Sequence, residues 1–91
     1  MAVTYTYNEQ KNQLLIEVRG IGFEEVIKAI KAGNIIDNLT HFNKRKYPHQ
    51  HMYAVNIKDY AYVVPYVIDK NKKEIFLKTI YPNRKLTRKY L

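Results

Sequence analysis

The chain has 91 residues, no cysteine and a formal net charge of +8. This length predicts one domain over residues 1–91 with a small core, and the lack of cysteine excludes a disulfide framework and a cysteine-ligated metal site. No apolar run approaches the ~20 residues of a membrane span, and no signal peptide is evident. P-loop, zincin and serine-hydrolase motifs are absent. We therefore expect a cytoplasmic protein with no membrane partner.

Charge is unevenly distributed along the chain. Residues 1–40 carry four basic and five acidic side chains, a net charge of −1, whereas residues 41–91 carry twelve basic and three acidic side chains, a net charge of +9. A one-sided basic surface predicts a polyanionic partner such as nucleic acid, an acidic protein or a membrane surface. The alternative is a lysine-rich surface that only aids solubility.

The N-terminal part predicts a strand followed by a helix. Residues 3–7 alternate Val and Tyr with Thr, which is typical of a strand. Residues 9–19 are interpreted as a helix, with Asn8 as its N-cap and Gly20 as its C-cap. The apolar residues of this segment also alternate as in a strand, but its polar beginning, Glu9 to Gln13, is a poor strand entry.

A second helix is the clearest element of the sequence. Residues 23–32 form one apolar stripe, with acids in the first turn and lysines later, and Gly33 follows. Residues 34–39 predict a short strand. Residues 40–51 contain Pro48, three consecutive basic residues and all three histidines without periodicity, which indicates a loop.

Three strands then predict an antiparallel meander, over residues 52–57, 60–68 and 74–80. Lys58-Asp59 is its first turn and residues 69–73 are its second. The two-residue first turn sets which side chains share a face of the sheet, because side chains alternate along a strand.

One face of this meander would carry large aromatic side chains and the other small apolar ones. The first set is Tyr53, Tyr60, Tyr62, Tyr66 and Tyr81. The second set is Ala54, Ala61, Val63, Val67, Phe76 and Ile80. We predict that the helices pack on the second face and that the tyrosine face stays partly open, where its rings can stack on unpaired bases. The alternative is that each tyrosine is an ordinary half-buried strand residue.

Cations and histidines gather in the predicted loop. Lys44, Arg45 and Lys46 precede His49. Basic residues bind a phosphate backbone, and a histidine titrates near neutrality, as general acid–base catalysis requires. His49 and His51 lack a nearby acid or cysteine to complete a metal site, so we predict no metal and no cofactor. The alternative is a solvated loop with exposed histidines.

The end of the last strand carries a second group of cations. Pro82 stops the strand and Asn83 is a good N-cap for a short basic helix, so Arg84 and Lys85 would lie at a helix start, where a phosphate also meets free N–H groups. Lys78 interrupts an apolar strand, so it either emerges at the sheet's end or has a buried partner. The alternative is a lysine whose stem lies along the apolar surface.

The order of these features resembles a known family. Arg19-Gly20-Ile21-Gly22-Phe23-Glu24-Glu25-Val26 follows the first helix, and the meander closes with Ile75-Phe76-Leu77-Lys78-Thr79-Ile80-Tyr81-Pro82-Asn83-Arg84-Lys85. With the opening strand and Lys11-Asn12, these stretches resemble the BrnT family of bacterial toxins, within the RelE-like group of ribonucleases. The resemblance spans nearly the whole chain.

The resemblance implies a fold of the α+β class. Its small antiparallel sheet, a meander of three strands plus one or two N-terminal strands, would carry two helices on one face and a short C-terminal helix. The implied activity is that of a type II toxin–antitoxin toxin, a metal-independent endoribonuclease that inhibits translation. Its partners would be a cognate antitoxin protein and RNA, including ribosome-associated messenger RNA, with operator DNA bound only through the antitoxin.

Site residues follow from the resemblance and from the chemistry of cleavage. The family's arginine just after the last strand matches Arg84, whereas Pro65-Tyr66 stands where the family tends to have an arginine. The 2′-hydroxyl of RNA attacks the adjacent phosphorus, which needs a base, an acid and cations. The expected catalytic residues are Arg84, Lys78, His49 and Tyr66. The expected RNA-binding residues are Lys44, Arg45, Lys46, Lys85, Arg88 and Tyr81.

Two other functions fit the same residues. One is a non-catalytic RNA- or DNA-binding module with a basic, tyrosine-rich surface. The other is a protein whose basic surface only binds an acidic partner. RNA cleavage in EDTA distinguishes the enzyme from the module, and the salt dependence of RNA binding tests the third hypothesis.

Overall fold

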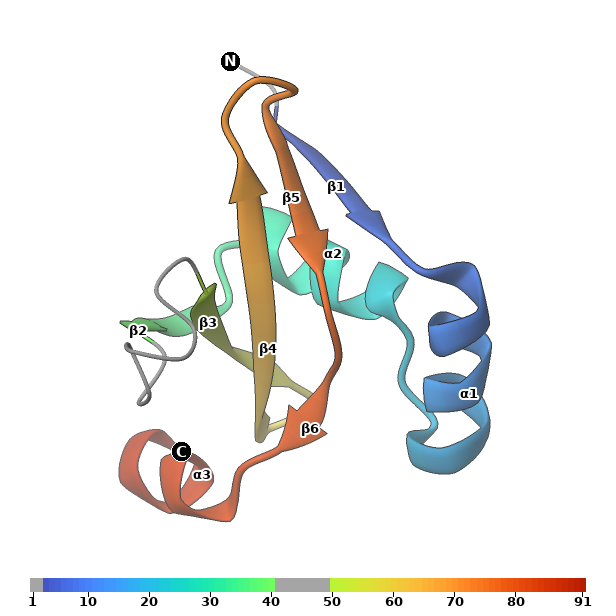
Figure 1. Ribbon diagram of the computed structural model, residues 1–91. Coiled ribbons are helices and arrows are strands. Elements are labelled where there is room, and N and C mark those ends of the chain that lie inside the picture. The colour runs from blue at the N-terminus through green and yellow to red at the C-terminus, as the bar shows by residue number, and fades with distance from the viewer. Residues whose placement is uncertain (1–2, 41–49) are drawn as a thin grey trace.

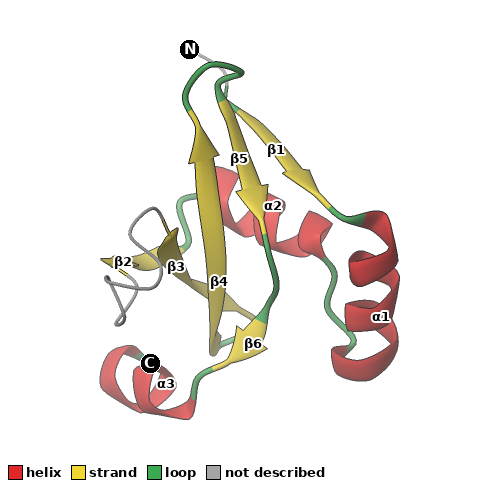
Figure 2. Cartoon of the chain, viewed as in Figure 1, coloured by secondary structure: helices red, strands yellow, loops and turns green. Residues whose placement is uncertain are grey.

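The computed structural model describes residues 3–40 and 50–91, which form three helices and a six-stranded sheet of the α+β class (Figure 1, Figure 2). The helices are α1 (Glu9–Arg19), α2 (Phe23–Lys31) and α3 (Arg84–Tyr90). The strands are β1 (Thr4–Tyr7), β2 (Ile35–Thr40), β3 (Gln50–Ile57), β4 (Tyr60–Asp69), β5 (Glu74–Leu77) and β6 (Tyr81–Pro82). Within these residues, no helix has the length and apolar character needed to cross a bilayer.

The sheet is mixed, whereas we expected an antiparallel one. Its strand order is β1-β5-β4-β3-β2, and β6 pairs with β4 beyond the end of β5. The strands from β2 to β5 run antiparallel, but β1 pairs in parallel with β5, with Tyr5 opposite Ile75. The prediction is therefore wrong at this edge. The physical reason is that β1 connects to the sheet through two helices, so no tight turn forces it to run antiparallel to its neighbour.

Both N-terminal helices form where the sequence predicts them. The Lys11 N–H donates a hydrogen bond to Asn8 Oδ1 (2.9 Å), and Gly20 ends α1 with a φ of 73°. These caps confirm the helix over residues 9–19 and exclude the alternative strand. α2 ends one residue before its predicted boundary, and Gly33 follows with a φ of 80°.

Asn12 and Gly22 hold the corner between α1 and α2. The Phe23 N–H donates to the Oδ1 of buried Asn12 (2.8 Å), which satisfies a donor in the first turn of α2. A Cβ at Gly22 would lie 2.7 Å from this oxygen and 2.9 Å from Ile16 Cγ1. The corner is therefore too tight for any residue larger than glycine at position 22.

The β3–β4 hairpin has the predicted register. Ile57 pairs with Tyr60, and the pairing continues to the start of β3. Lys58 and Asp59 have φ values of 53° and 63°, the two positive values of a type I′ turn. The backbone twist of this turn matches that of the strands, so the two turn residues were sufficient to predict the pairing of β3 with β4.

The strand predicted over residues 74–80 ends earlier, at Leu77, and a separate short strand follows beyond the predicted range; Pro65 explains where the first one ends. The Lys78 N–H donates to the Pro65 carbonyl (2.8 Å). Pro65 has no N–H to return a second bond, so the ladder stops at this point. β5 accordingly ends at Leu77, and the chain pairs with β4 again only at β6.

The junction of β5 and β6 contains a bulge that reverses the faces. Leu77 pairs with Tyr66. Tyr81, four residues later, pairs with Val63, which is only three residues away from Tyr66 along β4. The extra residue is a β-bulge, and because of it Ile80 lies in the same core cluster as Leu77. The predicted placement of Ile80 and Tyr81 is therefore exchanged, since one inserted residue moves side chains to the opposite face.

The helical layer covers the tyrosine face, opposite to the prediction. Tyr53 and Tyr66 are buried, with 8% and 3% of their surface exposed, and Tyr7 stacks on Phe23 of α2 with 5.0 Å between ring centroids. Large rings fill the deep space below the helices and bury more apolar area than alanines would. The largest fully buried side chains are Phe23, Leu77, Ile80, Val26, Val55, Val63 and Val64.

The small-residue face is covered at one end by α3. Ala61 and Val63 of β4 are almost completely buried, and α3 contacts β4 near the end that carries them (Figure 1). Small side chains allow this close approach of a helix. Nearer the other end of the same face, Phe76 of β5 stays exposed.

Candidate nucleic-acid interface

α3 begins directly after the sheet because of two adjacent residues. Pro82 cannot donate a further ladder bond. The Leu86 N–H donates to Asn83 Oδ1 (2.9 Å), so Asn83 is the N-cap that the sequence predicts. Arg84 is consequently the first residue of the helix.

Hydrogen bonds at both ends fix α3 to the sheet. The Asn83 N–H donates to the Ala61 carbonyl (2.9 Å), and the Ala61 N–H donates to Thr87 Oγ1 (2.9 Å). The Thr87 hydroxyl donates in turn to the Asn83 carbonyl (2.8 Å). At the other end, the Tyr90 hydroxyl donates to Asp37 Oδ2 of β2 (3.3 Å). The helix is therefore attached to both β4 and β2.

α3 presents four cations and no acid. Arg84, Lys85, Arg88 and Lys89 are all exposed. None of them forms an ion pair within the part of the chain that the structure describes, although Lys89 Nζ lies 5.3 Å from the centroid of the Tyr90 ring. Because no carboxylate neutralises them, these four side chains form the kind of positive surface that attracts a polyanion.

Lys78 lies at the surface just before β6. Its side chain is exposed, and the bond from its N–H to the Pro65 carbonyl keeps Lys78 opposite Pro65. Pro65 in turn pairs with Met52, so the register places Lys78 on the face that α3 covers at one end. Of the two predicted possibilities, Lys78 therefore emerges from the sheet.

Tyr81 is partly buried on the same face. Its hydroxyl donates to Met52 Sδ at 3.7 Å, a long contact to a weak acceptor. Burial raises the pKa of Tyr81, so its hydroxyl stays protonated at neutral pH. Because Tyr81 lies three residues before Arg84, it is the aromatic residue of β6 next to the α3 cations.

Tyr66 lies away from this surface, and its predicted catalytic role stays a prediction. It lies in the core, where its hydroxyl donates to Asn38 Oδ1 of β2 (2.8 Å). Its ring stacks on Tyr53 and on His51, with centroid distances of 4.1 and 5.5 Å. Only 3% of the Tyr66 surface is exposed, and its hydroxyl proton is engaged by Asn38.

The predicted residues of the middle loop fall outside the described residues. These are Lys44, Arg45, Lys46 and His49, and their roles stay predictions. His51, the histidine that the described part of β3 contains, is half-buried against the Tyr66 ring.

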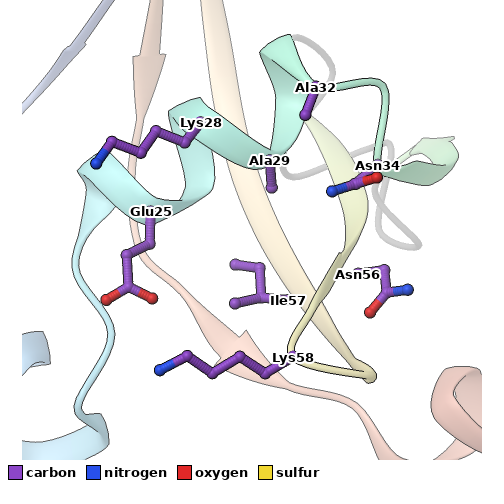
Figure 3. Close-up of a pocket in the computed structure, with 8 residues that line it drawn as sticks. All are labelled: Glu25, Lys28, Ala29, Ala32, Asn34, Asn56, Ile57 and Lys58. Carbon is purple, nitrogen blue, oxygen red and sulfur yellow. The ribbon is translucent and has the colours of Figure 1, made fainter.

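A shallow groove of about 330 Å³ lies between α2 and the end of β3 (Figure 3). Glu25 and Lys58 extend along one side of it, and Asn34 and Asn56 lie on the other. With two lysines and one glutamate in its lining, it carries less positive charge than α3 and attracts a phosphate chain more weakly. Among the described residues, no three metal-ligating side chains come together.

The residues that attach α3 to the sheet were not predicted from the sequence. Thr87 bonds to a residue 26 positions away, and Tyr90 bonds to a residue 53 positions away. Neither contact can be predicted from neighbouring residues in the sequence, because a hydroxyl group in a short helix can equally well be exposed to solvent. In the sequence, Thr87 is distinguished only as an uncharged polar residue within a basic segment.

The fold and this surface define a small basic α+β protein with an exposed cationic helix fixed to its sheet. No protein-family model, curated protein or solved structure gives a significant match to the chain.

Proposed function

We propose that this protein is the toxin of a type II toxin–antitoxin module, a cytoplasmic, metal-independent endoribonuclease of the RelE-like group, similar to BrnT. It would cleave RNA through attack of the 2′-hydroxyl and so inhibit translation. A cognate antitoxin would neutralise it and connect it to operator DNA. The resemblance of the glycine-rich corner and the last strand supports this proposal.

The observation that carries the proposal is the cationic surface of α3. Four exposed cations stand on a helix whose position is fixed by hydrogen bonds to β4 and β2. An RNA backbone is the polyanion that such a surface would bind, and fixed cations stabilise the charge that develops when a phosphodiester is attacked. An acidic segment of an antitoxin would compete for the same surface.

Each of these basic and aromatic residues has a proposed role in RNA cleavage. Arg84 and Lys85 stabilise the pentacoordinate phosphorus, and Lys78 contributes from the adjacent edge. Tyr81, whose hydroxyl is protonated, is a hydrogen-bond donor beside them. His49 of the middle loop would supply or accept a proton, since histidine titrates near neutrality.

The direct test is cleavage of a single-stranded RNA in EDTA. Arg84→Ala is expected to lower the rate about 100-fold, the cost of removing one group that stabilises transition-state charge. Arg19→Ala removes an exposed arginine at the end of α1 and serves as the charge-matched control with an unchanged rate. A substrate with a 2′-deoxy sugar at the cleaved position should resist, because it lacks the nucleophile. Equal rates for Arg84→Ala and wild type would contradict the proposal.

A non-catalytic RNA- or DNA-binding module is the second candidate. The observation that favours it is the burial of Tyr66, which removes one predicted proton-transfer group from the surface. The same assay separates the two candidates. Retention of intact RNA by the wild-type protein, weakened by Arg84→Ala, would support the module.

A further inference from the structure

Phe76 is an exposed aromatic residue of β5, the strand next to the β1 edge of the sheet. Its neighbours along β5, Ile75 and Leu77, belong to the core or pack against it, so by alternation Phe76 lies on the opposite face. There it is flanked in the ladder by Val67 of β4 and Thr6 of β1, and 40% of its surface is exposed. Both flanking side chains are smaller than phenylalanine, so the ring is the most prominent group of this row.

Charge differs on the two sides of this ring. Lys78, two residues further along and roughly 7 Å away at the rise of a strand, is exposed on the same face. The α3 cations follow beyond β6. In the other direction, Glu74 pairs with Asp69 and places two carboxylates next to the Phe76 row. The turn beyond these carboxylates carries Lys70, Lys72 and Lys73, so a phosphate chain that passes over Phe76 meets basic residues at both ends, and Lys78 with α3 is the larger group of cations.

From this arrangement we infer that Phe76 is a stacking platform for one unpaired base of a single-stranded RNA whose phosphates continue along Lys78 to α3. The inference rests on the proposed function and adds the substrate class. Every base has a π-face, so stacking on an aromatic ring tolerates any sequence. A duplex keeps its bases stacked inside the helix and cannot place one on the ring. Phe76 thus selects single strands over duplexes.

The test compares Phe76→Leu, Phe76→Trp and wild type in anisotropy titrations with uncleavable 2′-O-methyl RNA of about ten nucleotides, as a single strand and as a duplex. Phe76→Leu keeps an apolar side chain but removes the π-face. It is expected to weaken single-strand binding about fivefold to 150-fold, the loss that follows removal of one base stack, and to leave duplex binding unchanged. Phe76→Trp keeps a ring and retains tight binding. Ile68→Ala, an exposed residue on the opposite face of the sheet, is the control.

Each outcome decides the inference. Unchanged single-strand affinity of Phe76→Leu, or an equal loss for duplex RNA, overturns it. Arg84→Ala in the same titrations tests the proposed function separately. If Arg84→Ala weakens RNA binding and Phe76→Leu does not, the proposed function is still supported while the role of Phe76 is not. If the wild-type protein binds neither RNA, both proposals fail. If Phe76→Leu instead releases the protein from phosphatidylserine vesicles or dissociates a dimer in sedimentation, the ring faces a membrane or a second copy.

Discussion

Asn12 and Gly22 act as a pair at the scale of single residues. The Asn12 oxygen lies 2.7 Å from where a Cβ at position 22 would stand, and this oxygen also accepts the bond from the Phe23 N–H. The distinctive glycine-containing stretch of the sequence therefore has a structural role that its spacing alone did not reveal. It sets how closely α2 follows α1, and so how α2 lies on the sheet.

Gly22→Ala is expected to lower the free energy of unfolding by about 1–3 kcal/mol, the usual cost of overpacking a tight site. The new methyl group would push against the Asn12 oxygen and Ile16. Urea denaturation followed by circular dichroism measures this loss. Glu17→Ala, on the exposed side of α1, is the control and should change stability by no more than about 0.5 kcal/mol. A Gly22→Ala protein as stable as wild type would contradict the tight corner.

Tyr53 predicts how stability depends on alkaline pH. Burial, with the neighbouring Tyr66 and Tyr5 rings, raises its pKa above the ordinary value of 10.0. Above pH 10 the unfolded chain therefore releases the phenol proton while the folded protein still holds it, so the contribution of Tyr53 to stability is constant below pH 10 and falls above it. Urea unfolding at about pH 8 and about pH 11 should show a smaller fall for Tyr53→Phe than for wild type. Tyr60→Phe, in the same hairpin, is the control.

At the scale of elements, α3 depends on Thr87. Its hydroxyl accepts from the Ala61 N–H and donates to the Asn83 carbonyl, so one side chain joins the helix to β4 and to its own cap. The positions of Arg84 and Arg88 follow from this attachment, because a seven-residue helix is too short to be stable alone.

Thr87→Val is expected to destabilise the protein by about 1–3 kcal/mol, because it leaves the Ala61 N–H without its partner. It should also weaken RNA binding although no charge changes, since the α3 cations lose their fixed positions. Amide hydrogen exchange at Ala61 would report the loosened attachment. Thr4→Val, an exposed strand position in β1, is the matched control. If the Ala61 amide exchanges at the same rate in the Thr87→Val variant as in the wild-type protein, this role of Thr87 is contradicted.

The β5–β6 junction shows how one element decides the surface. Pro65 has no N–H to donate to the ladder, and the chain between β5 and β6 contains one extra residue before Tyr81. The side chains of Ile80 and Tyr81 therefore lie on the faces opposite to those that simple alternation predicts. As a result Ile80 enters the core while Tyr81 remains beside α3. Because of the bulge, Tyr81 lies on the face of the sheet that leads to Arg84, and Ile80 does not.

At the scale of the whole molecule, charge is separated along the structure. α1 and α2 together carry four acids and four basic side chains and are neutral, whereas α3 carries four basic side chains and no acid. A polyanion is therefore attracted to one side of the molecule, and its binding should weaken steeply with salt because each neutralised phosphate releases counterions.

The log–log slope of RNA affinity against salt is expected to be about −0.7 for each phosphate that the protein neutralises. Arg88→Ala should make the slope about 0.7 less negative, because it removes one of these contacts. Lys70→Ala, in the turn at the other end of β4, loses the same charge far from α3 and should leave the slope unchanged (Figure 1). Equal effects of the two variants would indicate a response to net charge alone.

The sequence by itself determined the local elements of this protein. The caps at Asn8, Gly20 and Asn83 and the Lys58-Asp59 turn act over at most four residues, so they are readable from the chain and they set where helices and the hairpin form. The exposed cations Arg84 and Lys85 were predicted for the same reason, since they follow directly from an N-cap.

Only the tertiary structure decided which face of the sheet is covered. Alternation divides the side chains of a strand into two sets but does not say which set the helices bury. Packing volume made that choice, so Tyr66 became a core residue and Phe76 an exposed one. The parallel pairing of β1, the bulge opposite Pro65 and the attachment of α3 by Thr87 likewise depend on partners distant in sequence, and no local pattern encodes them.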